Sequence, residues 1–150
     1  MNPILFRGRF EHTIDDKGRM AIPAKFRDAI AENHNGRLII TNLPHCLVIY
    51  TPDKWEILES KASRLSTLKA NVQGFLRYFY SGATECEMDK QGRILVPPTL
   101  RKAAGLGKQV VLAGMLHKIE IWSLERWDEE IQRAVDNFDQ IAEELADFGL

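Results

Sequence analysis

Short apolar stretches alternate with charged turns along the chain. Residues 8–14 and 19–22 mix apolar and polar positions around one such turn, which predicts two short strands, and residues 38–41 and 46–50 predict two more. Phe26, Ala29 and Ile30 recur at helical spacing after Pro23, so we expect a helix over 24–33. Strands this short are not stable alone, and the pattern therefore predicts that they share one larger sheet or barrel.

The same pattern occurs twice. Residues 8–30 align with residues 82–104, and seven polar or glycine and proline positions coincide: Gly8/Gly82, Glu11/Glu85, Asp15/Asp89, Gly18/Gly92, Arg19/Arg93, Pro23/Pro97 and Arg27/Arg101. The later strands align as well once a two-residue gap is placed in the loop of the second copy, which is two residues shorter, and Trp55 then matches Trp127. A match of this length indicates an internal duplication. We expect an α+β fold in which the two copies close one small β-barrel about an approximate two-fold axis.

The duplication divides the chain into four segments: a first repeat over 7–54, a helical linker over 55–81, a second repeat over 82–126 and an acidic C-terminal helix over 127–150. The spacing of apolar residues predicts helices over 53–65, 67–80 and 124–147. One apolar face of the linker would be buried either in the core or against another subunit: Leu65, Leu68, Val72, Phe75, Leu76 and Phe79.

Each repeat carries the motif Asp-x-x-Gly-Arg. Aspartate favours the first position of a type I turn, because its carboxylate accepts the amide two residues ahead, and glycine fits the left-handed residue of a following bulge. Asp15, Gly18, Asp89 and Gly92 are therefore predicted to form turns. The bulge aims the next side chain, Arg19 or Arg93; the alternative role of these arginines is an exposed ion pair, worth less than about 1 kcal/mol.

Basic residues gather around both turns. They are Lys17, Arg19, Lys25 and Arg27 in the first repeat and Arg93, Arg101 and Lys102 in the second. A two-stranded ribbon fits the major groove of DNA, where arginine can bond guanine O6 and N7, and lysine can neutralise phosphates. The net charge of −1 conceals an asymmetry: residues 123–150 carry nine acidic and two basic residues, and the rest carries 18 basic and 12 acidic residues. The sequence predicts a DNA-binding surface on a basic body.

Composition narrows the other possibilities. The chain has 45% hydrophobic and 27% charged residues, as globular domains do, and no apolar run approaches the roughly 20 residues of a membrane helix. Cys46 and Cys86 lack a paired spacing, which favours a reducing cytoplasm. No Ser/His/Asp or Cys/His set recurs at duplicated positions, and His45 and His117 have no companions at a zinc spacing. We therefore expect no enzyme, no catalytic residue, no cofactor and no metal.

Four stretches carry a resemblance over essentially the full length: "FRG", "DDKGRMAIPAKFR", "CEMDKQGRILVPPTLRKAAGL" and "WEILESKASRLS". They resemble the MraZ family of bacterial transcriptional regulators, and each half resembles a SpoVT/AbrB domain. The resemblance implies a swapped-hairpin β-barrel built by the two halves of one chain. It also implies ring-shaped homo-oligomers and places DNA-facing arginines at Arg19, Arg27, Arg93 and Arg101.

The function implied by this resemblance is that of a nucleoid-associated repressor. Such a protein binds short direct repeats in double-stranded DNA ahead of the division and cell-wall gene cluster, including its own operon. The copies are not equivalent, since His12 and Cys86 stand where AbrB has an arginine, and Asp28 stands opposite Lys102. The alternatives are an antitoxin-like or scaffolding protein that holds a partner on the same barrel, and an enzyme on that barrel.

Overall fold

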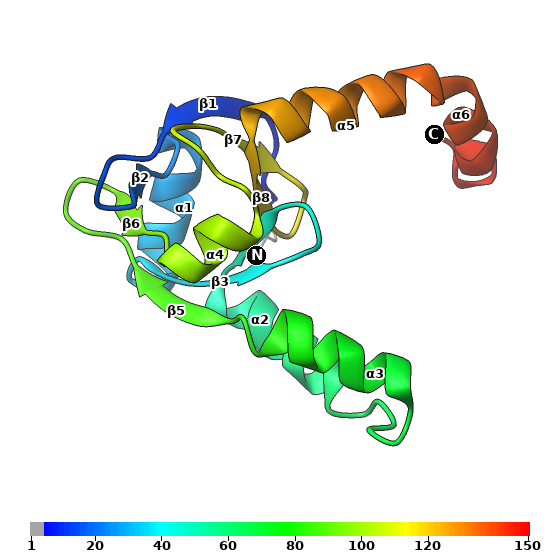
Figure 1. The fold of residues 1–150 in the computed structure, drawn as a ribbon, viewed down its shortest axis with the longest axis horizontal. Coiled ribbons are helices and arrows are strands. Elements are labelled where there is room, and N and C mark those ends of the chain that lie inside the picture. Colours follow the sequence, from blue (N-terminus) through cyan, green and yellow to red (C-terminus); the bar gives the residue numbers. More distant parts are fainter. Residues whose placement is uncertain (1–4) are drawn as a thin grey trace.

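A computed structural model describes residues 5–150, apart from the side chains of residues 32–34. The described chain is a mixed α/β structure of antiparallel sheets and helices (Figure 1). The first repeat contains β1 (Arg9–Thr13), β2 (Arg19–Ala21), α1 (Ala24–His34), β3 (Arg37–Asn42) and β4 (Leu47–Tyr50). The second contains β5 (Thr84–Glu87), β6 (Arg93–Leu95), α4 (Pro98–Ala103), β7 (Gln109–Gly114) and β8 (Ile119–Ser123). The strands and the first helix predicted from the sequence are thus confirmed.

The two repeats exchange strands. The larger sheet has the order β1-β7-β8-β4-β3-β5, and β2 pairs with β6 in a separate ribbon. The first strand of each repeat therefore pairs with a strand of the other repeat. Met20 faces Ile94 in the ribbon and Val48 faces Glu120 in the sheet, and each pair occupies equivalent positions of the duplication. An approximate two-fold axis consequently passes through both sheets.

Barrel closure is the part of the predicted fold that is not seen. Among residues 5–150 the strands form two sheets, of six and two strands, instead of one continuous ladder. Between the two halves of the first hairpin, the described residues form one isolated antiparallel bridge, which joins Ile14 to Met20 just outside the turn. Pro23 and Pro97 each stand two residues after the end of their strand of the ribbon, and because proline lacks a ladder donor they limit the length of this ribbon, which has three residues per strand. The strand exchange is observed, and closure into a barrel stays a prediction.

The main core lies between the six-stranded sheet, the ribbon and the helices α1 and α4. Both repeats supply fully buried residues from matching positions, including Met20, Ile22, Ile40, Leu47, Ile94, Val96, Leu112 and Ile119. Burying each such side chain stabilises the fold by roughly 1.5–3 kcal/mol. Because the core draws on both halves, neither repeat has a complete core without the other.

The linker helices cover the outer face of β3 and β4. They comprise α2 (Pro52–Ala62), α3 (Ala70–Phe75) and a π-helical turn, η1 (Leu76–Tyr80). Trp55 and Phe79 stack with their ring centroids 5.6 Å apart and pack with Ile39 and Val48. Of the predicted apolar face, Phe79 is buried, whereas Leu65, Leu68 and Phe75 are exposed. The outer end of this helical arm therefore presents apolar side chains to solvent.

The predicted continuous helix over 124–147 is wrong. The structure has α5 (Leu124–Asp136), α6 (Phe138–Leu145) and a 3-10 turn (Ala146–Phe148). The break falls at Asn137, whose backbone leaves the helical region and whose backbone and side-chain amides both donate to the carbonyl of Arg133. In Figure 1, α5 extends away from the sheets and α6 folds back at its end. Within the described chain, no helix has the length and apolar character needed to span a membrane.

Candidate nucleic-acid interface

The first Asp-x-x-Gly-Arg motif forms the predicted turn. The Gly18 amide donates to the Asp15 carbonyl at 2.9 Å, and the amides of Lys17 and Arg19 donate to Asp15 Oδ1 at 3.0 and 2.9 Å. Gly18 has φ +86°, a left-handed conformation that favours glycine. The aspartate thus closes the corner and the glycine permits the bulge.

The second motif repeats this geometry. The Gly92 amide donates to the Asp89 carbonyl at 3.0 Å, and the amides of Gln91 and Arg93 donate to Asp89 Oδ1, each at 2.9 Å. Gly92 has φ +76°. The four turn-forming residues predicted from the sequence, Asp15, Gly18, Asp89 and Gly92, are therefore confirmed in both repeats.

Each turn ends in an arginine that forms an ion pair with the turn's own aspartate. Arg19 Nε lies 2.7 Å from Asp15 Oδ2, and Arg93 Nε lies 3.0 Å from Asp89 Oδ2. Within residues 5–150 no hydrogen bond engages the terminal amino groups of either guanidinium. The ion pair is thus present, and it fixes the inner edge of each guanidinium while the donor fork at its end remains available.

The two aspartates keep their charge at neutral pH. The backbone amide of Arg19, followed by its guanidinium, holds the pKa of Asp15 below its usual value. The pKa of Asp89 is lowered in the same way, chiefly by the backbone amide of Arg93. Because both pKa values are depressed in the folded state, these contacts stabilise the turns above the ordinary aspartate pKa and are lost as the pH falls through the lowered values.

Both turns lie at the same end of the molecule. Figure 1 shows the loops next to β2 and β6 side by side, at the end opposite α3 and α6. The pairing of β2 with β6 sets this arrangement, because Arg19 faces Leu95 and Arg93 faces Ala21 across the ribbon. Lys17 is exposed in the first turn, Lys25 on α1, and Lys102 in the last turn of α4. The duplicated turns therefore present two arginines on one surface, with exposed lysines on the turns and helices around it.

Arg27 and Arg101 contact the turn of the opposite repeat, a feature that sequence reasoning missed. Arg27 Nη1 donates to the carbonyl of Gln91 at 3.1 Å, and a methyl group added at Gly92 would overlap the Arg27 side chain. A methyl group added at Gly18 would lie 2.9 Å from the guanidinium carbon of Arg101. The only signal in the sequence was that both arginines recur at equivalent positions after the turn.

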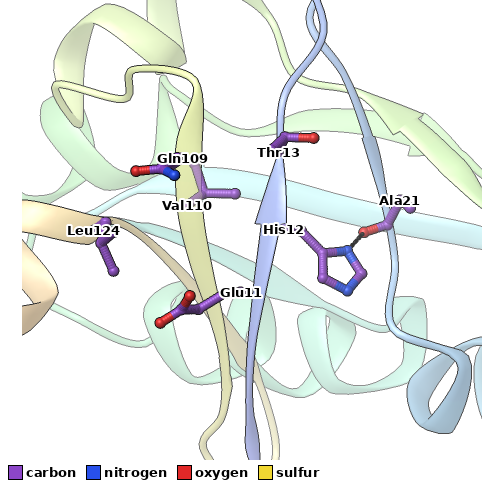
Figure 2. Close-up of a pocket in the computed structure, with 7 residues that line it drawn as sticks. All are labelled: Glu11, His12, Thr13, Ala21, Gln109, Val110 and Leu124. Atoms are coloured by element: carbon purple, nitrogen blue, oxygen red, sulfur yellow. Dashed lines mark hydrogen bonds between the residues drawn. The ribbon is translucent and has the colours of Figure 1, made fainter.

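A hollow of about 420 Å³ beside β1 offers the next candidate site (Figure 2). Glu11 and His12 are its acid–base groups, but Figure 2 shows them pointing to opposite sides of β1, as successive strand residues do. His12 Nδ1 bonds the carbonyl of Ala21 at 2.8 Å and so links β1 to β2. The hollow therefore brings no acid–base pair together.

The two thiols are inert. Burial raises the pKa of Cys46 and of Cys86 to about 12, so each is protonated at neutral pH and poorly nucleophilic. Among the side chains that the structure describes, His, Cys, Asp and Glu form no group of three that could hold a metal ion. The two basic turns are therefore the candidate functional site of the described residues.

Comparison with known proteins matches both halves separately. A family model described as "MraZ protein, putative antitoxin-like" covers residues 5–78 and again residues 79–149. The chain is 44% identical over 146 residues to a protein named transcriptional regulator MraZ from Pediococcus pentosaceus, and equally to one from Ligilactobacillus salivarius, covering 97% of this chain and 100% of each relative. A third, from Desulfitobacterium hafniense, is 45% identical over 147 residues, with 97% of this chain and 100% of the relative covered. The boundary between the two matches, at residues 78 and 79, falls within η1, ahead of β5.

Proposed function

The chain belongs to the MraZ family, and we propose that it is a sequence-specific DNA-binding transcriptional regulator that acts as a repressor. Its ligand is double-stranded DNA carrying short direct repeats ahead of the division and cell-wall gene cluster, including its own operon. The observation that supports this proposal most strongly is the pair of Asp-x-x-Gly-Arg turns at one end of the molecule.

The proposed interface assigns different tasks to the basic residues. Arg19 and Arg93 lie at the ends of the two turns with their terminal amino groups available, which suits bidentate contact with guanine in the major groove. Lys17, Lys25 and Lys102 are exposed around them and would neutralise phosphates. Arg27 and Arg101 complete the set behind the tips. The ribbon of β2 and β6 would carry Arg19 and Arg93 at one end of a swapped-hairpin barrel, and α1 and α4 beside it would carry the helical residues Lys25, Arg27, Arg101 and Lys102.

We also propose that the protein acts as a ring-shaped homo-oligomer at the nucleoid, in the cytoplasm. The molecule has two helical arms, the linker over residues 52–80 and the C-terminal helices over residues 124–148. Large exposed apolar side chains on both arms support self-association, because Leu68 is 91% exposed, Phe138 63% and Phe148 76%. One subunit, with its two arginine-bearing turns, covers a short DNA site and binds it weakly. When several subunits of one oligomer bind neighbouring repeats, each bound subunit raises the effective concentration of the next, and weak contacts give stable occupancy.

Footprinting on the DNA upstream of the protein's own gene tests this function. The expected result is protection of regularly spaced short repeats, with protection that weakens steeply as salt rises from 50 to 200 mM, on the order of a thousandfold in affinity for six phosphate contacts. A scrambled fragment of equal length and composition is the control. Equal affinity for both fragments, or no protection at any salt concentration, would contradict the proposal.

The alternative to the repressor function is an antitoxin-like or scaffolding function. A protein that uses the same surface to hold a protein partner would leave the upstream fragment unprotected at every salt concentration. It would also show no preference for repeats over the scrambled control. The footprint therefore separates the two functions in one experiment.

A further inference from the structure

Each turn is held by the opposite repeat. The amide of Ile22 donates to the carbonyl of Gly92 at 2.9 Å, and the amide of Val96 donates to the carbonyl of Gly18 at 2.8 Å. Ile22 and Val96 are equivalent residues of the duplication, as are Gly18 and Gly92. The backbone that links the ribbon strand to the helix in one half therefore anchors the glycine of the turn in the other half.

An arginine side chain adds a second contact at the same place. Arg27, on α1, reaches the carbonyl of Gln91 and lies against Gly92 of the second repeat. Arg101, on α4, lies against Gly18 of the first repeat. A hydrogen bond from Arg101 Nε to the carbonyl of Val96, at 3.1 Å, holds the side chain there. Both arginines are partly buried in this arrangement. The two glycines are thus required by their positive φ and also by the arginine that lies over them.

We propose that Arg27 and Arg101 are positioning residues that lock the turn of the opposite repeat, so that Arg19 and Arg93 are held as one rigid pair. Arginine suits this role because its planar guanidinium combines a directed donor with a flat surface that packs on a glycine backbone. The consequence is reciprocal: the first repeat orients the tip of the second, and the second orients the tip of the first. This inference rests on the proposed DNA-binding function for its purpose, and on the contacts alone for its geometry.

Hydrogen–deuterium exchange of the full chain tests the lock without DNA. Arg27→Ala is expected to raise exchange about tenfold for the amides hydrogen-bonded in residues 89–93 and to leave residues 15–19 unchanged. Arg101→Ala should do the reverse. Lys25→Ala, on the same helix as Arg27 and with the same loss of charge, is the matched control and should alter neither turn. Unchanged exchange in the opposite turn, or an equal rise in both turns for either variant, would overturn the proposal.

Arg27→Lys covers the case in which the alanine variant does not fold. It keeps the positive charge but lacks the planar fork, so exchange in residues 89–93 should still rise. Exchange equal to that of the unmodified protein would show that the guanidinium is not needed and would overturn the lock.

DNA affinity provides the readout that a merely structural role would not move. The lock predicts that Arg27→Ala and Arg27→Lys both weaken binding to the upstream fragment about tenfold, with the slope of log affinity against log salt unchanged. A phosphate contact by Arg27 predicts instead that lysine restores affinity and that alanine reduces the slope by about 0.9, which would overturn the lock. If the unmodified protein binds no DNA, the proposed function fails while the exchange result still decides the geometry.

Discussion

Replacing Arg19 and Arg93 together with alanine is expected to abolish specific DNA binding while leaving the protein folded. Each arginine offers its terminal amino groups beyond an ion pair with the turn's aspartate, and a bidentate contact with guanine contributes about 1–3 kcal/mol of discrimination. Losing two such contacts should lower affinity for the direct repeats on the order of a hundredfold or more. The ion pairs that are lost are exposed and contribute less than about 1 kcal/mol each to stability, so Tm should change little.

The matched control removes the same charge from the far end of the molecule. Lys61 and Arg64 are exposed at the end of α2, on the arm opposite the turns. Binding isotherms of the double variant Lys61→Ala/Arg64→Ala on the same fragment should match those of the unmodified protein. If both double variants lose affinity equally, charge alone drives binding and the turns have no special role. An Arg19→Ala/Arg93→Ala protein that fails to fold would show that the arginines are structural.

Gly18→Val is expected, in contrast, to act first on stability and only through the fold on DNA binding. Valine is β-branched and strongly disfavours the φ of +86° that Gly18 adopts, and its side chain would displace Arg101 from the turn. Strain of this kind costs about 1–3 kcal/mol, which corresponds to a fall in Tm of roughly 3–10 °C for a chain of this size. DNA binding should fall as a consequence, because Arg19 follows the distorted turn.

Gly107→Val is the control for this change. Gly107 has no positive φ, and a methyl group added there would meet nothing within 4 Å in the described structure. Thermal unfolding followed by circular dichroism should give this variant nearly the Tm of the unmodified protein. A Gly18→Val protein with an unchanged Tm would mean that the turn tolerates an ordinary residue, and that the duplicated glycines are not there for conformation.

The sequence alone predicts the turns because their chemistry is local. The aspartate, the amide two residues ahead and the left-handed glycine all lie within four residues, so a pattern in the chain is sufficient. The strands and α1 follow for the same reason. The duplication adds one non-local prediction, that the halves share a fold, and the interleaved pairing of β1 with β7 and of β5 with β3 agrees with it.

What the sequence does not predict depends on contacts between the repeats. Arg27 and Arg101 are basic residues beside a turn in the sequence, but only the antiparallel pairing of β2 with β6 places each against the glycine of the other half. The break at Asn137 is equally hidden, because the apolar spacing on both sides of it remains helical and the backbone departs only at that residue. The charge and the periodicity of a sequence show which residues share one face of an element. They do not show which part of the other repeat packs against that face.

The central claim is that the two turns form a single DNA-reading surface, and exchange protection on DNA binding tests it most directly. Hydrogen–deuterium exchange of the full chain would be measured with and without saturating DNA from upstream of its own gene. We expect protection of residues 15–19 and 89–93 together, with the outer ends of both helical arms unaffected by DNA apart from any change that assembly itself causes. Protection confined to one turn, or to the arms while DNA is fully bound, would contradict it.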